Sequence, residues 1–188
     1  MFANQTIAKA VVACEAFIAG KDDAWSIDRP SAEFLHQVVL AMRARVILEI
    51  GASYGHSGLF LAAAATRTDG RLFTVERDPR KVAVARGFFQ RAGLSDRVTI
   101  LHGEAPAILS QAPVSIDLLF IDATKSQQDM YLDALWPRLA RRAAIITDNV
   151  STHPAEMAGF LNRLRADPRL ASVLVPFGHG MEFSVRVD

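Results

Sequence analysis

Three side chains with oxygen donors follow two apolar runs of the sequence and could together bind a metal ion. Asp122 ends the run at residues 116–122 (IDLLFID), and Asp148 ends the run at 143–148 (AAIITD), with Asn149 directly after it. Two carboxylates and an amide oxygen at one point form an all-oxygen site, which suits Mg²⁺. Either aspartate taken singly could equally cap a loop. The pair together favours a metal site, and Lys125 closely follows the first aspartate.

A turn rich in glycine follows another apolar run, residues 45–51 (RVILEIG), and could pass close to a ligand. Gly51 and Gly55 lie in this turn, with Ser53 between them. Glycines let the backbone approach a ligand, although a plain tight turn would use them too. The spacing is not the G-x-G-x-x-G of dinucleotide-binding proteins, which argues against a nicotinamide or flavin enzyme. Glu49 beside the turn suits a ligand with an ammonium group.

Acidic residues near two further run ends could recognise a nucleoside. Glu76 ends the run at 71–76 (RLFTVE), 25 residues after the first glycine of that turn. A carboxylate at this position can accept both ribose hydroxyls, although a surface glutamate paired with Arg77 is the alternative. Glu104 or the backbone of Ala105 could meet an adenine edge. An acid at the start of a helix is equally explained by the helix dipole.

The runs that carry these candidates alternate with helical patterns, which is typical of an α/β protein. Expected strands cover residues 45–51, 71–76, 97–101, 116–122, 143–148, 172–176 and 181–187. Expected helices cover residues 31–43, 57–66, 78–92, 127–140 and 154–166, after an N-terminal helix. The last two strands are joined by so short a connection that they must be antiparallel, whereas the others form a parallel sheet. In such sheets ligands bind at the carboxyl ends of the strands, near the point where the strand order reverses.

No histidine or cysteine pattern competes with the oxygen site. The histidines are scattered, and no H-x-x-x-H or cysteine–histidine spacing predicts a zinc site. His36 lies in the expected helix 31–43 but away from its apolar stripe, so we expect it to face solvent.

Composition narrows the class of protein further. The chain has 188 residues, of which 51% are apolar, which suits one compact domain. Its 21 basic residues nearly balance its 20 acidic residues, which argues against a nucleic-acid-binding protein. One cysteine cannot form an internal disulfide, and the first residues lack a secretory pattern, so we expect a cytoplasmic protein. The apolar stretch at 7–20 is interrupted by charges and is too short to span a bilayer.

Several segments, in order, resemble the metal-dependent O-methyltransferases of the catechol and caffeoyl-CoA type, which are class I S-adenosylmethionine-dependent enzymes. The first cofactor motif of that family is similar to VILEIGASYGHSGLFLA, and its second and third strands to GRLFTVERDPRKVAVARGFFQRAGLSDRVTILHGEA. Its metal and base motifs are similar to DLLFIDATK and ITDNV, and its closing hairpin to PFGHGMEFSVR. The resemblance spans residues 25–187. It implies an α/β, Rossmann-like, seven-stranded, mostly parallel sheet with a C-terminal antiparallel hairpin and helices on both faces.

The resemblance also implies a single domain, residues 1–188, and a role for each residue that matches a family motif. Residues 1–30 would form an N-terminal helix and lid segment, and residues 31–188 the core. Glu49 would hold the ammonium group of S-adenosylmethionine, Ser57 its carboxylate and Glu76 its ribose. The whole cofactor-binding set would be Ile27, Glu49, Gly51, Ser53, Gly55, Ser57, Glu76, Glu104, Ala105 and Asp122.

The same resemblance implies the ion and the reaction. Asp122, Asp148 and Asn149 would ligate Mg²⁺ or another divalent cation, and Lys125 would act as the general base. The acceptor would be a small phenolic or catechol-like molecule, with Trp25 a wall for its ring. The protein would be a homodimer without a nucleic-acid or membrane partner.

The chain departs from the family's pattern at three places. Many members carry an acidic residue at Thr124, a tyrosine at Gln128 and a glycine pair at residues 142–143, which are arginine and alanine in this sequence. These departures leave the metal set intact and leave the acceptor open. Four alternatives remain: methylation of a hydroxylated tRNA nucleoside, a metal-independent methyltransferase, a dinucleotide oxidoreductase and a nucleoside-binding protein without catalysis.

Overall fold

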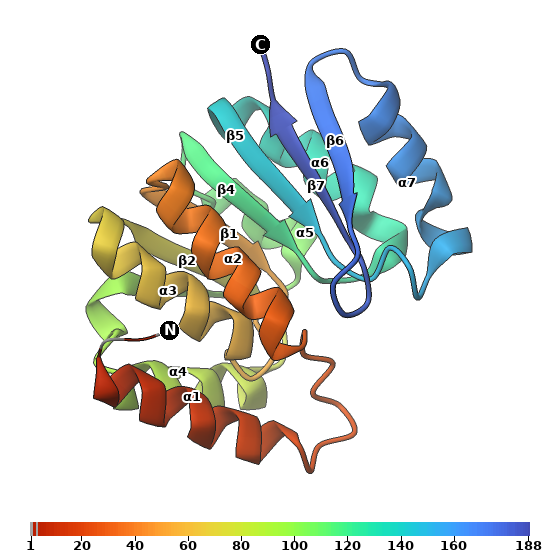
Figure 1. The fold of residues 1–188 in the computed structure, drawn as a ribbon. Coiled ribbons are helices and arrows are strands. Elements are labelled where there is room, and N and C mark those ends of the chain that lie inside the picture. Colours follow the sequence, from red (N-terminus) through yellow and green to blue (C-terminus); the bar gives the residue numbers. More distant parts are fainter. Residues whose placement is uncertain (1, 3) are drawn as a thin grey trace.

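One sheet of seven strands forms the centre of the computed structural model, which describes residues 2 and 4–188 (Figure 1). The strands are β1 (Val46–Ile50), β2 (Arg71–Glu76), β3 (Val98–His102), β4 (Ile116–Ile121), β5 (Leu139–Thr147), β6 (Leu170–Val175) and β7 (Met181–Arg186). Their order is β3-β2-β1-β4-β5-β7-β6. β1 to β5 pair in parallel, whereas β7 is antiparallel to both β5 and β6. The predicted fold, mostly parallel with a closing antiparallel hairpin, is confirmed.

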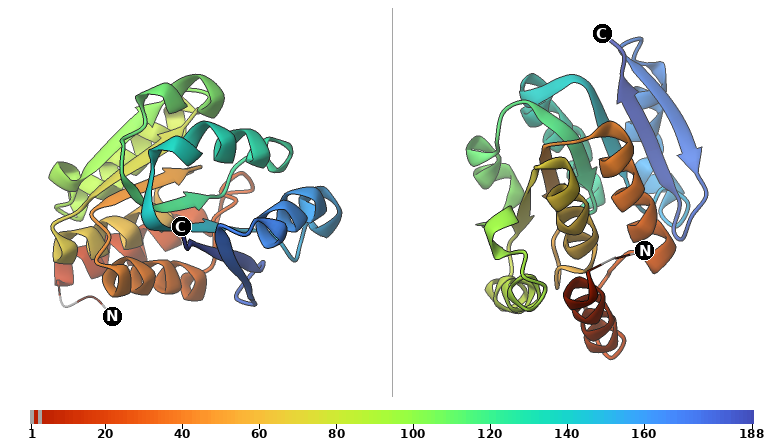
Figure 2. Two further views of the ribbon diagram at one scale, coloured as in Figure 1. Left: turned by 90° about the horizontal axis from the view of Figure 1, so that it is seen from above. Right: turned by 60° about the vertical axis from the view of Figure 1, so that its left-hand side comes forward.

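Helices cover both faces of this sheet, as expected. They are α1 (Gln5–Ile18), α2 (Arg29–Met42), α3 (His56–Thr68), α4 (Pro79–Arg91), α5 (Ala105–Ile108), α6 (Gln128–Leu135) and α7 (Pro154–Ala166). One buried apolar cluster joins α1 to α4 to one face, and a second joins α5 to α7 to the other. Figure 2 shows these layers from above and from the side.

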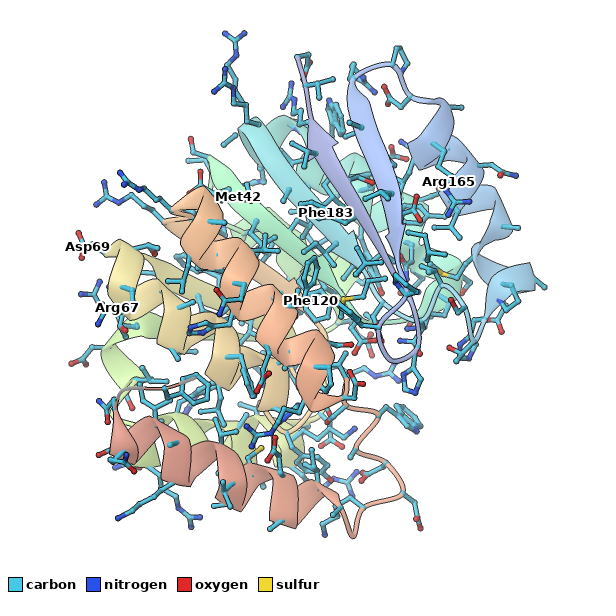
Figure 3. All side chains as sticks on the ribbon, viewed as in Figure 1. Met42, Arg67, Asp69, Phe120, Arg165 and Phe183 are labelled. Carbon is cyan, nitrogen blue, oxygen red and sulfur yellow. The ribbon has the colours of Figure 1, made fainter. Side chains whose placement is uncertain are left out.

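The strands form because their residues are apolar on both faces, as a sheet covered on both sides requires. On β4, Leu118 and Phe120 join the core under α2 and α3, whereas Leu119 and Ile121 join the core under α5 to α7. Figure 3 marks Phe120 and, two strands further along the sheet, Phe183, which packs against the same cluster. The middle of the sheet is therefore rigid, and its strand ends are held in fixed positions.

Capping residues set where the loops leave the helices near those strand ends. At the start of α2, Asp28 accepts a hydrogen bond from the backbone N–H of Ser31 at 3.0 Å. At the start of α4, Asp78 accepts one from the backbone N–H of Arg80 at 2.8 Å, and Pro79 between them is the first residue of the helix. An acceptor at this position satisfies a backbone donor that the first turn of a helix leaves free.

Two predicted boundaries differ from the structure by four or more residues. The helix predicted at 127–140 ends at Leu135 and gives way to a 3₁₀ turn, Trp136–Arg138. Pro137 explains the early end, because it has no backbone N–H to continue the hydrogen bonds of the α-helix. The strand predicted at 143–148 begins at Leu139, and its pairing with β4 shifts register where Arg142 adopts a left-handed φ of 63°.

The expectation that His36 faces solvent is also wrong. His36 is buried, and its Nδ1 lies 3.0 Å from the backbone oxygen of Phe60 on the neighbouring α3. The ring of Phe2 covers it edge-on, with the ring centroids 5.5 Å apart. The apolar stripe of α2 packs toward the sheet, but α3 and the N-terminal segment cover a second side of this helix, where His36 lies.

In the part of the chain that the structure describes, no helix is long and apolar enough to cross a membrane.

Candidate active site

A cavity of about 670 Å³ lies at the carboxyl ends of β1 to β5, where the strand order reverses between β1 and β4. This is the place where open α/β sheets bind ligands, and the volume suits a nucleoside-sized molecule. Figure 1 shows the loop after α1 and the tip of the β6–β7 hairpin at the same edge of the sheet. The residues that line the cavity are Asp23, Trp25, Ile50, Gly51, Ser53, Val75, Glu76, Arg77, Asp78, Arg80, Lys81, Gly103, Glu104, Ala105, Asp122, Ala123, Thr124, Lys125, Tyr131, Asn149, His153 and His179.

Gly51 lets the ends of β1 and β4 approach each other at the cavity floor. Its φ is 104°, and a Cβ atom added to it would lie 2.0 Å from the backbone oxygen of Asp122. No other residue type fits this position, because both the space and the backbone conformation exclude a side chain. Gly51 therefore sets the distance between the turn after β1 and the residues that follow β4.

Glu76 ties the turn after β1 to the end of β2. Its Oε2 accepts a hydrogen bond from the backbone N–H of Ser53 at 2.8 Å, and its Oε1 accepts two from the N–H groups of Arg77 and Asp78 at 2.9 Å. The side chain is nearly buried but reaches the cavity wall. A carboxylate fixed in this way is oriented before any ligand arrives.

The ends of β4 and β5 bring the three oxygen-bearing candidates together. The amide Nδ2 of Asn149 donates to Asp122 Oδ1 at 2.9 Å and to Asp148 Oδ2 at 2.7 Å. Lys125 Nζ lies 3.2 Å from the same Asp122 oxygen, and His179 Nδ1 lies 3.9 Å from Asp148 Oδ2. All of these residues except Asp148 line the cavity.

The two aspartates carry more negative charge than their surroundings balance. Burial, and next the neighbouring Asp122 carboxylate, raise the pKa of Asp148 to about 7. Burial also raises the pKa of Asp122, against the opposing effect of Lys125. Asp148 Oδ1 is buried and has no hydrogen-bond partner among the described residues. A buried carboxylate oxygen without a partner is costly unless a cation or donor satisfies it.

Carboxylates, thiols and imidazoles alone do not build this site. Over residues 2 and 4–188, no group of three or more histidine, cysteine, aspartate or glutamate side chains could hold a metal ion. The amide of Asn149 would have to complete a set of two carboxylates, as the sequence predicted, and water or a substrate oxygen would supply the rest.

Four predicted cofactor residues, Ile27, Glu49, Gly55 and Ser57, do not lie on the cavity wall, and neither does the predicted metal ligand Asp148. Glu49 is fully buried, and its carboxylate accepts hydrogen bonds from the hydroxyls of Ser57 at 2.5 Å and Thr74 at 2.6 Å. Burial raises the pKa of Glu49 to about 7, despite these two hydrogen bonds. In this structure Glu49 and Ser57 link β1, α3 and β2. The other predicted residues, Gly51, Ser53, Glu76, Glu104, Ala105 and Asp122, do line the cavity.

Sequence reasoning missed several cavity residues. Lys81 reaches the cavity from α4, His153 precedes α7, and His179 lies at the tip of the β6–β7 hairpin. The glycines on either side of His179 place it in the turn of the predicted closing hairpin, but no local pattern indicates that this turn reaches the cavity. Lys81 and His153 carry no local signal, because only the packing of distant elements brings them to the cavity.

An α/β protein with a nucleoside-sized cavity, an acidic residue after β2 and paired aspartates after β4 and β5 belongs to the class that binds nucleoside cofactors at strand ends. The chain belongs to the O-methyltransferase family, whose model matches residues 19–187. The proposed resemblance to this family is thereby confirmed.

Curated relatives and solved structures agree with the family. The chain is 41% identical over 128 residues to a catechol O-methyltransferase of Mycobacterium tuberculosis, covering 66% of this chain and 57% of that protein. It is 35% identical over 131 residues to a catechol O-methyltransferase of Niastella koreensis, covering 66% and 58%. A Bacillus cereus O-methyltransferase, solved in complex with SAH, matches with a TM-score of 0.83 and 26% identity over 99% of this chain and 92% of that chain. The chain thus spans less than three fifths of the length of the first two relatives.

Proposed function

We propose that this chain transfers a methyl group from S-adenosylmethionine to a hydroxyl of a small, catechol-like aromatic acceptor, with the help of Mg²⁺ or another divalent cation. One observation carries the proposal. The Asp122 carboxylate lies on the wall of the cavity and contacts both Asn149 and Lys125, so the ion, the base and the cofactor would meet at one point. The names of the two catechol relatives support the acceptor class.

The cofactor would occupy the part of the cavity between the ends of β1, β2 and β3. Glu76 would accept the ribose hydroxyls, and Glu104 and Ala105 would lie along the adenine. Because Glu49 is not on the wall, Asp122 is the cavity carboxylate best placed for the ammonium group. Gly51 and Ser53 would bring backbone close to the methionine part.

The residues at the ends of β4 and β5 fit a divalent cation. The unpartnered Oδ1 of Asp148 and the raised pKa of both aspartates indicate a site that lacks positive charge. Asp122 and Asp148 would hold the cation together with the amide oxygen of Asn149, whose side-chain amide would turn over, because its Nδ2 faces both carboxylates in this structure. This is the oxygen-rich set that Mg²⁺ prefers. When bound, such a cation lowers the pKa of a hydroxyl that coordinates to it.

Lys125, as the neutral amine, would take the proton from the acceptor hydroxyl. Its Nζ is 3.2 Å from Asp122 Oδ1, and its side chain is 14% exposed, so it is held at the cavity rather than free in solvent. Methyl transfer from a sulfonium is an in-line displacement, in which the acceptor oxygen forms a bond to the methyl carbon as the carbon–sulfur bond breaks. The main task of the protein is therefore to align the two reactants.

A screen of acceptors tests this function. Purified protein is incubated with S-adenosylmethionine, Mg²⁺ and either aromatic vicinal diols or their single-hydroxyl analogues, and released S-adenosylhomocysteine is measured. We expect release with the diols and little with the analogues. Release with tRNA and with none of the small acceptors would contradict the proposed acceptor class.

The predicted homodimer, the single-domain division and the cytoplasmic location remain predictions of the sequence.

A further inference from the structure

Three side chains fasten residues 23–25 of the loop after α1 to the rim of the cavity. Ser53 Oγ donates to the backbone oxygen of Ala24 at 2.5 Å. The hydroxyl of Tyr54 donates to the carboxylate of Asp23 at 2.9 Å. Lys81 Nζ donates to the backbone oxygen of Asp23 at 2.5 Å. We call residues 23–25 the lid loop and these three contacts the clasp. Two of them come from the predicted cofactor turn, so hydrogen bonds connect the lid loop to that turn.

Lys81 is an unusual part of the clasp, because it is a charged residue that is only 8% exposed. Its Nζ lies 5.1 Å from the ring centroid of Trp25 and 5.2 Å from that of Tyr54. Within the described part of the chain it makes no ion pair with a carboxylate. A shielded ammonium group then depends on the two ring faces and on the Asp23 carbonyl for its stabilisation.

The backbone of the lid loop has an unfavourable conformation at Trp25. Trp25 has a φ of 39°, in the left-handed region that residues other than glycine rarely adopt. Its side chain is 77% exposed although it lines the cavity, so its own burial does not fix it. Release of the clasp would relieve the backbone of Trp25 and uncover the cavity.

We infer that Lys81 is a positioning residue that keeps the lid loop closed over the cofactor and limits the rate at which the cofactor leaves. The inference rests on the proposed function only in taking the cofactor to be S-adenosylmethionine and its product. It concerns the Nζ contacts with Asp23 and Trp25, and not the reacting atoms. Loss of those contacts should speed cofactor exchange without altering the ends of β4 and β5.

The chain allows a direct optical test. It has two tryptophans, and the second, Trp136, lies away from the cavity between Arg169 and Arg186, whose guanidinium carbons are 4.1 and 4.9 Å from its ring centroid. In a Trp136→Phe background, emission reports Trp25 alone. The experiment measures Trp25 emission, the dissociation rate of S-adenosylhomocysteine by stopped flow, and the unfolding temperature, with and without Lys81→Met.

We expect Lys81→Met to raise the dissociation rate at least about tenfold, which is the low end expected for loss of a hydrogen bond from a charged group, with the lost cation–π contact adding to it. Trp25 emission should change in intensity, because the Lys81 ammonium group no longer lies over its ring. Lys81→Arg should restore part of both signals, because it keeps a cation and a donor. Lys21→Met is the matched control: Lys21 Nζ lies 4.9 Å from the Phe17 ring, and only the backbone oxygen of Lys21, which the substitution keeps, contacts the lid loop, so both signals should stay unchanged.

The outcomes separate this inference from the proposed function. If the Trp136→Phe protein does not bind S-adenosylhomocysteine, the proposed function is wrong. If it binds, but Lys81→Met leaves the dissociation rate within about twofold and Trp25 emission unchanged, the role of Lys81 is wrong. If Lys81→Met does not fold cooperatively, Lys81→Gln takes its place. This variant keeps a donor but loses the charge, and an unchanged dissociation rate for it would likewise overturn the inference.

Discussion

Asn149 donates a hydrogen bond from its side-chain amide to Asp122 at 2.9 Å, although the two residues are 27 positions apart in the sequence. The register of the sheet explains this contact. β4 and β5 are parallel neighbours with Ile121 opposite Thr147, so the residues that follow each strand meet at one edge. Asn149 adopts a left-handed φ of 69°, which turns the chain immediately after Asp148. The candidate ion site is therefore a product of strand pairing.

Replacement of Asp148 by asparagine should abolish the response of the protein to divalent cations. A cation that binds only the folded state raises the unfolding temperature with its concentration, by about 2–4 °C for each kcal/mol in a protein of this size. We expect Mg²⁺ to raise the midpoint of the unaltered protein in thermal unfolding and to leave Asp148→Asn unchanged. Asp96→Asn, on an exposed 3₁₀ turn, is the control and should respond normally. Equal responses of all three proteins would contradict the assigned ligands.

Replacement of Lys125 by methionine should slow turnover far more than it weakens cofactor binding. A general base typically contributes at least about 10²-fold to the rate. We expect kcat to fall by about this factor, with the affinity for S-adenosylmethionine in calorimetry changed little. Lys9→Met, at an exposed position of α1, should leave both quantities unchanged. A Lys125→Met enzyme within about twofold of the normal rate would show that another group removes the proton.

Replacement of Glu49 by glutamine should change how stability depends on pH. Burial raises the pKa of this carboxyl from its ordinary 4.5 to about 7, so the folded state holds a proton that the unfolded state releases between these values. The Glu49 contribution to stability therefore falls as pH rises from about 4.5 to 7, by about 3 kcal/mol at about 1.4 kcal/mol per pH unit.

Chemical unfolding at pH 5 and pH 8 checks this prediction. Glu49→Gln should match the unaltered protein at pH 5 and exceed it at pH 8. Identical pH profiles for the two proteins would mean that Glu49 is already ionised in the fold. Calorimetry with S-adenosylmethionine on the same variant decides whether Glu49 also holds the ammonium group, which its position behind the cavity wall does not favour.

Replacement of Arg142 by glycine should stabilise the protein. Arg142 has a φ of 63° at the irregular start of β5, in a conformation that costs a residue with a side chain about 1–2 kcal/mol. We expect Arg142→Gly to raise the free energy of unfolding by about 1 kcal/mol. Arg141→Gly is the matched control, and it should lower that free energy by about 0.5–1 kcal/mol, because ordinary strand residues lose from glycine. A destabilised Arg142→Gly would show that the arginine side chain makes a contribution larger than the strain.

The sequence was sufficient for the features that depend on local pattern. Apolar runs placed the strands, and the short connection before Met181 required the antiparallel hairpin. Because the parallel strands end at one edge of the sheet, the residues at their ends, such as Glu76 and Asp122, line one cavity.

Features that depend on packing between distant elements were not accessible in this way. His36 was assigned to solvent because the stripe of α2 describes contact with the sheet and not with α3. Glu49 was expected at the ligand because it adjoins the glycine turn, whereas the pleat of β1 directs it toward Ser57 and Thr74. Lys81 reaches a carbonyl 58 residues earlier in the chain, and no pattern around it indicates that contact.

The dependence of methyl transfer on a divalent cation tests the central claim most directly. Purified protein is treated with excess chelator, and S-adenosylhomocysteine release from S-adenosylmethionine and catechol is followed before and after Mg²⁺ is restored. Coordination by Asp122, Asp148 and Asn149 predicts that release stops in chelator and returns with Mg²⁺. A rate that is unchanged in excess chelator would contradict it.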